Sequence, residues 1–183
     1  MCVLNDQHME YRHSHLGGAI YLLVEGVLWI FSAALGAANQ IPAAMLVLLI
    51  GGMFIHPIAS ACSKGFGIPP SDKSNRLIAL NTWIALTIPL GLPLIFMVTA
   101  AGHTNLFFPA FAVLVGAHWL PFTYIYSMNT FLAIAGILVI AGILFGFVFT
   151  QHFSSCGFFV GAILLLFAAI HAFIVRRELR SLQ

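Results

Sequence analysis

Six apolar segments, each close to 20 residues long, take up most of this 183-residue chain. An α-helix needs about 20 apolar residues to cross the ~30 Å hydrocarbon core of a bilayer. Charged residues make up only 7% of the chain, whereas soluble domains carry about 25%. The apolar surface must therefore face lipid. This predicts an all-α polytopic membrane bundle of six transmembrane helices, covering residues 17–37, 41–62, 77–99, 105–126, 130–150 and 155–175.

Three polar stretches lie outside these spans. Residues 1–16 form a histidine-rich N-terminal segment, residues 63–76 form the longest loop, and residues 176–183 form a basic tail. The other connections are short, so neighbouring spans are predicted to run antiparallel. Only loop 63–76 is long enough for structure of its own, and a short interfacial helix beginning at Ser71 or Ser74 would fit there.

The positions of the basic residues predict the orientation. Lysine and arginine are held on the cytoplasmic side of membrane proteins. Six spans place all seven on one side, whereas five or seven spans would divide them between the two faces. Both termini are thus expected in the cytoplasm, in a multi-pass protein of the inner (plasma) membrane. The residues concerned are Arg12, Lys64, Lys73, Arg76, Arg176, Arg177 and Arg180. No basic stripe with interleaved aromatic residues occurs outside the spans, so the sequence does not favour a nucleic-acid partner.

Small residues and prolines predict how the helices pack. Gly142 and Gly146 are four residues apart in the fifth span, as are Gly157 and Gly161 in the sixth. Such pairs let helices approach closely. They serve either packing within one chain or a homo-oligomer, and the lipid bilayer is the other expected partner. The pair of prolines at 89 and 93 predicts a bend or break in the third span.

Five polar side chains inside the spans are the candidate ion- or substrate-binding residues. At about 1.5 Å of rise per residue, Glu25 and His118 lie roughly 12–13 Å from the cytoplasmic helix ends. The other three lie at roughly 6–8 Å, so all five fall in the cytoplasmic half, on five different helices. The set is Glu25, His56, Asn81, His118 and His171.

Each of these residues also has a structural explanation. A histidine in a membrane helix commonly bonds a neighbouring carbonyl, and an asparagine commonly joins two helices. Glu25 and His118 could form a purely structural pair. A charged side chain at such a depth costs about 2.5–3.5 kcal/mol on insertion scales, which makes Glu25 the hardest to explain by packing alone.

Taken together, three imidazoles and a carboxyl group could relay protons or ligate a divalent metal. The metal candidates are His56, His118, His171 and Glu25, but no ligand pair shares one helix at metal-binding spacing. No cofactor is therefore assigned beyond this open possibility of a metal. No hydrolase or metalloprotease motif occurs, so an enzyme is less favoured than a non-enzyme.

Residues 113–126 read VLVGAHWLPFTYIY. This stretch resembles a motif, Gly-Ala-His-x-Leu-Pro followed by alternating aromatic residues, of an uncharacterised family of small bacterial membrane proteins. The resemblance implies six spans and a bacterial origin, and it gives emphasis to Gly116, His118, Pro121 and Tyr124. It implies no activity.

Three functions remain open from the sequence. The first is transport of a small solute, ion or proton through the polar cluster. The second is a non-transporting membrane subunit or stress-response protein in which the cluster only fixes packing. The third is an intramembrane metalloenzyme.

Overall fold

The computed structural model describes residues 2–150 and 152–182, with side chains from residue 6 onward. Within them the chain is helical, and six helices are long and apolar enough to cross a membrane, as the sequence predicts. Their ranges are Leu16–Ala37, Ile41–Gly65, Leu77–Ala100, Thr104–Ile125, Thr130–Phe147 and Ser155–Ser181. The elements, in order, are α1 (Cys2–Ser14), η1 (Leu16–Gly18), α2 (Ala19–Ala37), α3 (Ile41–Gly65), α4 (Leu77–Ala85), α5 (Thr87–Ala100), η2 (Thr104–Leu106), α6 (Phe107–Trp119), α7 (Phe122–Ile125), α8 (Thr130–Phe147) and α9 (Ser155–Ser181).

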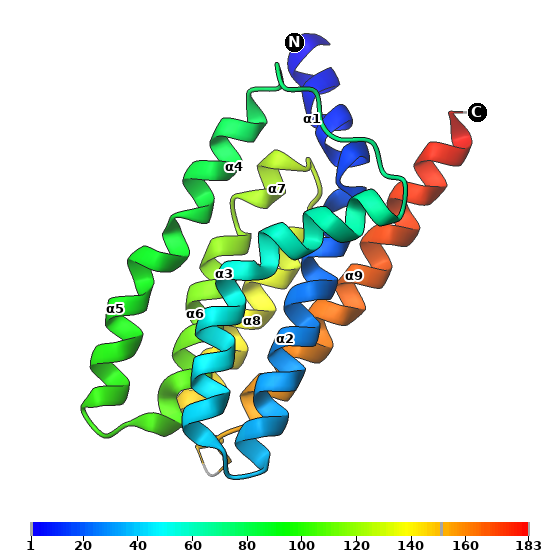
Figure 1. Ribbon diagram of the computed structural model, residues 1–183. Helices are drawn as coiled ribbons and strands as arrows, with labels where there is room; N and C mark the ends of the chain where they lie inside the picture. The colour runs from blue at the N-terminus through cyan, green and yellow to red at the C-terminus, as the bar shows by residue number, and fades with distance from the viewer. Residues whose placement is uncertain (1, 151, 183) are drawn as a thin grey trace.

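The core of the bundle consists of α2, α6, α8 and α9. α2 packs along α9, and α6 packs along α8. α3 covers α2 from outside, and α5 packs against α6 at the edge of the bundle (Figure 1). About half of the residues of α3, α4 and α5 are exposed, including Met53, Trp83 and Leu90. Because these helices are apolar, their exposed faces fit contact with lipid.

The small residues of α8 and α9 are used within the chain. A Cβ atom added at Gly142 would lie 2.6 Å from the carbonyl oxygen of Pro109 in α6. One added at Gly161 would lie 3.0 Å from the carbonyl oxygen of Gly26 in α2, and one added at Gly157 would lie 2.8 Å from the Phe108 ring and 2.9 Å from Ala33. A Cβ atom added at Gly146 would meet Pro109 only at ordinary contact distance, 3.4 Å. These glycines therefore explain close helix packing inside one chain, and nothing in the structure supports the possible homo-oligomer.

Two spans are broken next to prolines. The third span is divided at Leu86, between α4 and α5. Pro89 has no N–H for the Ala85 carbonyl, and its ring clashes with that carbonyl in a straight helix, so the break precedes it by one turn. In the fourth span α6 ends at Trp119, and Pro121 stands immediately before the short α7.

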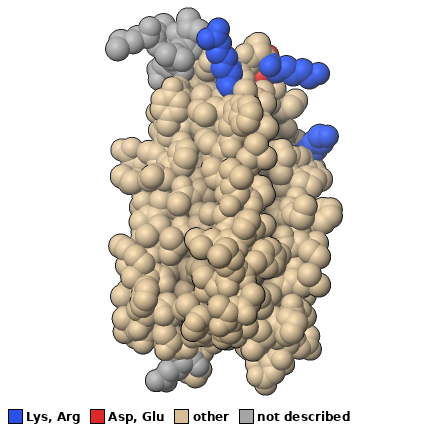
Figure 2. All heavy atoms as spheres, turned by 90° about the vertical axis from the view of Figure 1, so that its left-hand side faces the viewer, with Lys and Arg blue, Asp and Glu red and all other residues tan. Residues whose placement is uncertain are grey.

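Both termini and loop 66–76 lie at one end of the bundle (Figure 1). We call this the basic end, because all seven lysines and arginines lie in elements that meet there. Figure 2 shows an uncharged face below a few Lys and Arg side chains at this end. The opposite end is called the far end.

The polar ends of the chain are more helical than the sequence indicated. Residues 2–14 form α1, and α9 continues through the basic tail to Ser181. Conversely, residues 66–76 contain turns but no helix. The Ser71 hydroxyl and the Asp72 N–H, which could have begun a helix, instead donate to the carboxylate of Glu10 in α1.

Candidate functional site

The Glu25 carboxyl group lies in the centre of the bundle and is 7% exposed. Its Oε2 accepts a hydrogen bond of 3.1 Å from the indole Nε1 of Trp119, at the end of α6. No Lys, Arg or His pairs with it among the described residues. The indole of Trp29, one turn further along α2, faces the same carboxyl group. Its Nε1 is buried without a hydrogen-bond partner in the described part of the chain.

Two groups of aromatic rings enclose Glu25 along the bundle axis. Toward the basic end lies a cluster that we call the near cluster, made of Trp119, Phe122, Tyr126 and Phe131. Neighbouring ring centroids within it are 4.8 to 5.9 Å apart. All four side chains are at most 6% exposed, so the near cluster separates Glu25 from the basic end.

Toward the far end lies a second group, the far cluster, made of Trp29, Phe107, Phe108, Phe111 and Phe153. Its neighbouring centroids are 4.9 to 5.8 Å apart. Trp29, Phe107 and Phe108 are fully buried. Edge-to-face and tilted arrangements at these distances are favourable for aromatic pairs. Glu25 is therefore enclosed on both sides by aromatic side chains.

His118 does not contact Glu25 through a hydrogen bond, although the two were predicted at equal depth. Its Nδ1 lies 2.9 Å from Oγ1 of Thr87, the first residue of α5. The Thr87 hydroxyl itself donates to the carbonyl of Ile84, 2.7 Å away, in the last turn of α4. His118 thus links the break in the third span to the helix that ends just before the break in the fourth.

His171 is completely buried, and it lies 2.7 Å through Nδ1 from the carbonyl oxygen of Gly17. A carbonyl oxygen only accepts, so Nδ1 carries a hydrogen. This bond ties α9 to the turn that precedes α2. The Nε2 of His171 has no partner among the described residues.

Neither His56 nor Asn81 forms a hydrogen bond with Glu25 among the described residues. His56 is exposed on α3 and stacks on Tyr21, with centroids 5.6 Å apart. Asn81 is half-buried on α4, and none of the hydrogen bonds found in the described chain involves its side chain. The structure therefore distributes the five predicted residues over separate helix pairs and joins none of them in one cavity.

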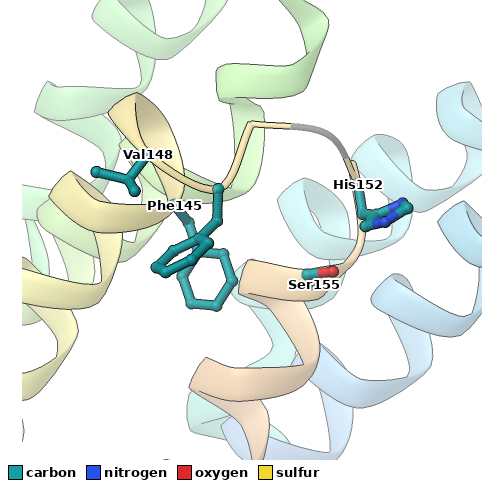
Figure 3. A pocket seen from close by; sticks show the side chains of 5 residues that line it. Phe145, Val148, His152 and Ser155 are labelled. Carbon is teal, nitrogen blue, oxygen red and sulfur yellow. The ribbon is translucent and has the colours of Figure 1, made fainter.

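Neither the pocket at the far end nor the placement of possible metal ligands among the described residues offers another candidate site. A shallow pocket of about 370 Å³ lies at the far end, lined by Phe145, Val148, Phe149, His152 and Ser155 (Figure 3). None of the predicted site residues lines it. Across the described residues, no three His, Cys, Asp or Glu side chains come together as a metal site would require. The possible divalent metal thus gains no support.

A family model described as a family of unknown function, DUF7010, matches residues 4–174. The chain belongs to the DUF7010 family. This agrees with the resemblance to an uncharacterised membrane-protein family, although the match itself assigns no activity. Comparison with curated proteins and with solved structures gives no match.

Sequence reasoning missed the two tryptophans of this DUF7010 chain. Trp29 follows Glu25 at helical spacing i+4, which was a usable signal that both share one face. Trp119 lies toward the basic end of its span, where interfacial aromatic residues are common, so its place in the sequence does not point to a partner in the core. Its position next to His118 in the motif gave no indication that its indole reaches α2, because that contact depends on how α6 packs.

Proposed function

We propose that this protein is a small proton- or ion-coupled transporter in which Glu25 binds the coupling ion inside the membrane. The observation that carries the proposal is the enclosure of the Glu25 carboxyl group between two aromatic clusters, with an indole rather than a cation as its hydrogen-bond donor. Intramembrane carboxyl groups usually mark ion or proton pathways. A site closed at both ends is the arrangement expected of a transporter between its two open states.

The second indole supports two positions for the carboxyl group. In the present structure Glu25 bonds Trp119, on the side of the near cluster. The unpaired Nε1 of Trp29 offers a donor one turn toward the far cluster. A change of side-chain rotamer at Glu25 would exchange one indole for the other. We propose that this exchange carries the bound proton between the two halves of the bundle.

The broken spans supply the parts that would move. Transport sites are often formed beside discontinuous helices. α4 and α5 lie at the bundle edge, and their break is bonded to His118 through Thr87. In this proposal His118 and Thr87 transmit movement, whereas His171 holds the turn before α2. The basic end faces the cytoplasm of the inner membrane, in keeping with the distribution of lysine and arginine.

The test is proton flux into liposomes that contain the purified protein, driven by a pH gradient and a potassium diffusion potential. Glu25→Gln keeps the side-chain volume but cannot release a proton, and it is expected to abolish flux. Asp6→Asn, at an exposed position of α1, is the matched control and should leave flux unchanged. Flux that persists in Glu25→Gln would overturn the proposal.

A second candidate is a non-transporting membrane subunit or stress-response protein. It is favoured by one observation: His56, His118 and His171 each have their own partner on a different helix pair. In that case the wild-type protein would show no flux above empty liposomes. Glu25→Gln would then change only thermal stability in detergent.

A further inference from the structure

α1 lies over the near cluster at the basic end. The ring of Tyr11 is 5.6 Å from the ring of Tyr126, a member of that cluster. Tyr11 is 2% exposed and Tyr126 is 3% exposed, so each covers the other. The N-terminal helix therefore closes the route from the basic end to the near cluster and, behind it, to Glu25.

A short left-handed turn joins α1 to α2. Leu16, Gly17 and Gly18 have φ values of 46°, 58° and 77°. Glycine adopts this region readily, whereas leucine is strained there. A Cβ atom at Gly17 would also lie 2.9 Å from the sulfur of Met128. The turn interrupts the helix, so α1 can change its angle to the bundle without unwinding α2.

Polar contacts hold α1 in place. Arg12 forms an ion pair with Glu178 of α9 and also donates to the Ser127 carbonyl, 3.4 Å away. His8 lies 3.0 Å through Nδ1 from the Ile125 carbonyl, at the end of α7. The Arg12 side chain is 13% exposed and that of Glu178 is 29% exposed, so this ion pair is partly shielded from water.

A half-buried imidazole lies at the centre of this contact. His15 stacks on Tyr11 with centroids 4.2 Å apart, and its Nδ1 is 2.9 Å from the Tyr11 carbonyl oxygen. The groups that face it are Tyr11 and Glu10 of α1, Tyr21 of α2, His56 of α3, and Tyr126 after α7. Burial lowers the pKa of His15; the Tyr11 carbonyl and Glu10 oppose this shift, and His56 adds to it.

The pKa of His13, the neighbouring imidazole of α1, is lowered as well. Burial, and then the charge of Arg12, lower the pKa of His13. Its Nε2 lies 3.6 Å from the carboxylate of Glu178, the group that already pairs with Arg12. Burial also raises the pKa of Tyr11, so its hydroxyl group stays neutral near physiological pH.

We propose that α1 is a pH-sensitive lid over the near cluster, docked at neutral pH and released when the basic side becomes acidic. The regulatory consequence, control of access to Glu25, rests on the transport function proposed above. The docking of α1 onto the near cluster does not depend on the transport function. The lid is α1, its hinge is Leu16–Gly18, its latch is the Arg12–Glu178 pair, and its sensors are His13 and His15.

Proton linkage decides whether a lower pH strengthens or weakens the docking of α1. A histidine in free α1 titrates near its ordinary pKa of about 6.5, and docking lowers that value. The undocked state therefore binds protons more readily, so docking is unaffected above this pH and weakens below it. The loss continues until the pH falls below the docked pKa. Each imidazole can weaken docking by at most about tenfold per pH unit.

The experiment is amide hydrogen exchange of the full-length protein in lipid nanodiscs at pH 7.5 and 5.5, corrected for the intrinsic exchange rate. Protection within α1 is expected to fall about tenfold or more at the lower pH, while protection in α2 stays unchanged. In a His13→Gln/His15→Phe double variant, which retains a ring at position 15, the two pH values should give protection within about twofold of each other. Equal protection at both pH values in the wild type would overturn the lid, and so would an undiminished pH response in the double variant.

Three further variants separate the possible failures. His103→Gln, in the far-end loop, is the matched control and should retain the full response. Glu178→Gln should raise exchange in α1 at both pH values, because it removes the latch; it also removes the carboxylate that faces His13, whereas the contacts of His15 remain. Glu25→Gln should keep the pH response of α1 even where proton flux is lost. If α1 responds to pH in a protein that shows no proton flux, only the transport proposal is rejected.

Discussion

At Glu25 a carboxyl group must be accommodated far from bulk water. The bundle provides one indole N–H and a surround of aromatic rings rather than a counter-ion. A hydrogen bond to a buried acceptor matters mainly because losing it leaves that acceptor unsatisfied. The tryptophans at 29 and 119 therefore determine how Glu25 is held, and they are the residues to change first.

Trp119→Phe keeps a ring in the near cluster but removes the N–H that reaches Glu25. The free energy of unfolding is expected to fall by about 1–3 kcal/mol, the usual cost of an unsatisfied buried group. Thermal unfolding in detergent measures the change. Trp83→Phe is the control, because Trp83 is 71% exposed on α4; its effect should stay within about 0.5 kcal/mol. Equal effects of the two substitutions would show that the Glu25 hydrogen bond contributes nothing.

Glycines explain where two helices pack closely, and prolines explain where a span is broken. The pairs α2–α9 and α6–α8 come together where glycines let one backbone touch another. The third and fourth spans are interrupted where prolines remove a backbone N–H. His118 and Thr87 connect the two interrupted spans, so the core helix α6 is joined to the break between α4 and α5 at the edge of the bundle.

Two glycines on α8 test the packing. Gly142→Ala would place a Cβ atom 2.6 Å from the Pro109 carbonyl oxygen, and such overpacking is expected to destabilise the protein by about 1–3 kcal/mol. Gly136→Ala, on the same helix, meets no atom within 4 Å. It should be neutral or stabilising by up to about 1 kcal/mol, because alanine favours the helix. The prediction fails if both variants unfold at the same temperature in detergent.

For the whole molecule, the placement of charge bears on which way the bundle faces. Both termini and all seven basic residues belong to one end. An orientation with this end in the cytoplasm would follow the usual placement of lysine and arginine. It would also place the α1 lid in the compartment whose pH it senses.

Single cysteines can test this orientation. In a background with all three native cysteines replaced, His103→Cys in the far-end loop should react with a membrane-impermeant maleimide applied to intact cells. Ser181→Cys, at the end of α9, should react only after the cells are permeabilised. The reverse pattern would show that the basic end faces outward.

Hydropathy and charge position were enough to predict six spans, because the cost of a polar backbone in lipid leaves a chain of this composition few alternatives. Proline chemistry likewise located the break in the third span. These are properties of single segments, and each is decided by residues that are neighbours in the sequence.

Partners across helices were not predictable in the same way. Depth along a helix can be counted, which is why Glu25 and His118 were placed at one level. Rotation about the helix axis cannot be counted, and it decides that Glu25 meets Trp119 while His118 meets Thr87. The residues of α1 were even less accessible to prediction, since Glu10 and Arg12 gain partners more than 60 positions away.

The sequence by itself determined how many helices there are and where charge is excluded, because solvation in lipid acts on each segment separately. Only the tertiary structure decided which side chains enclose Glu25 and what covers them, because those contacts depend on the packing of all the helices together.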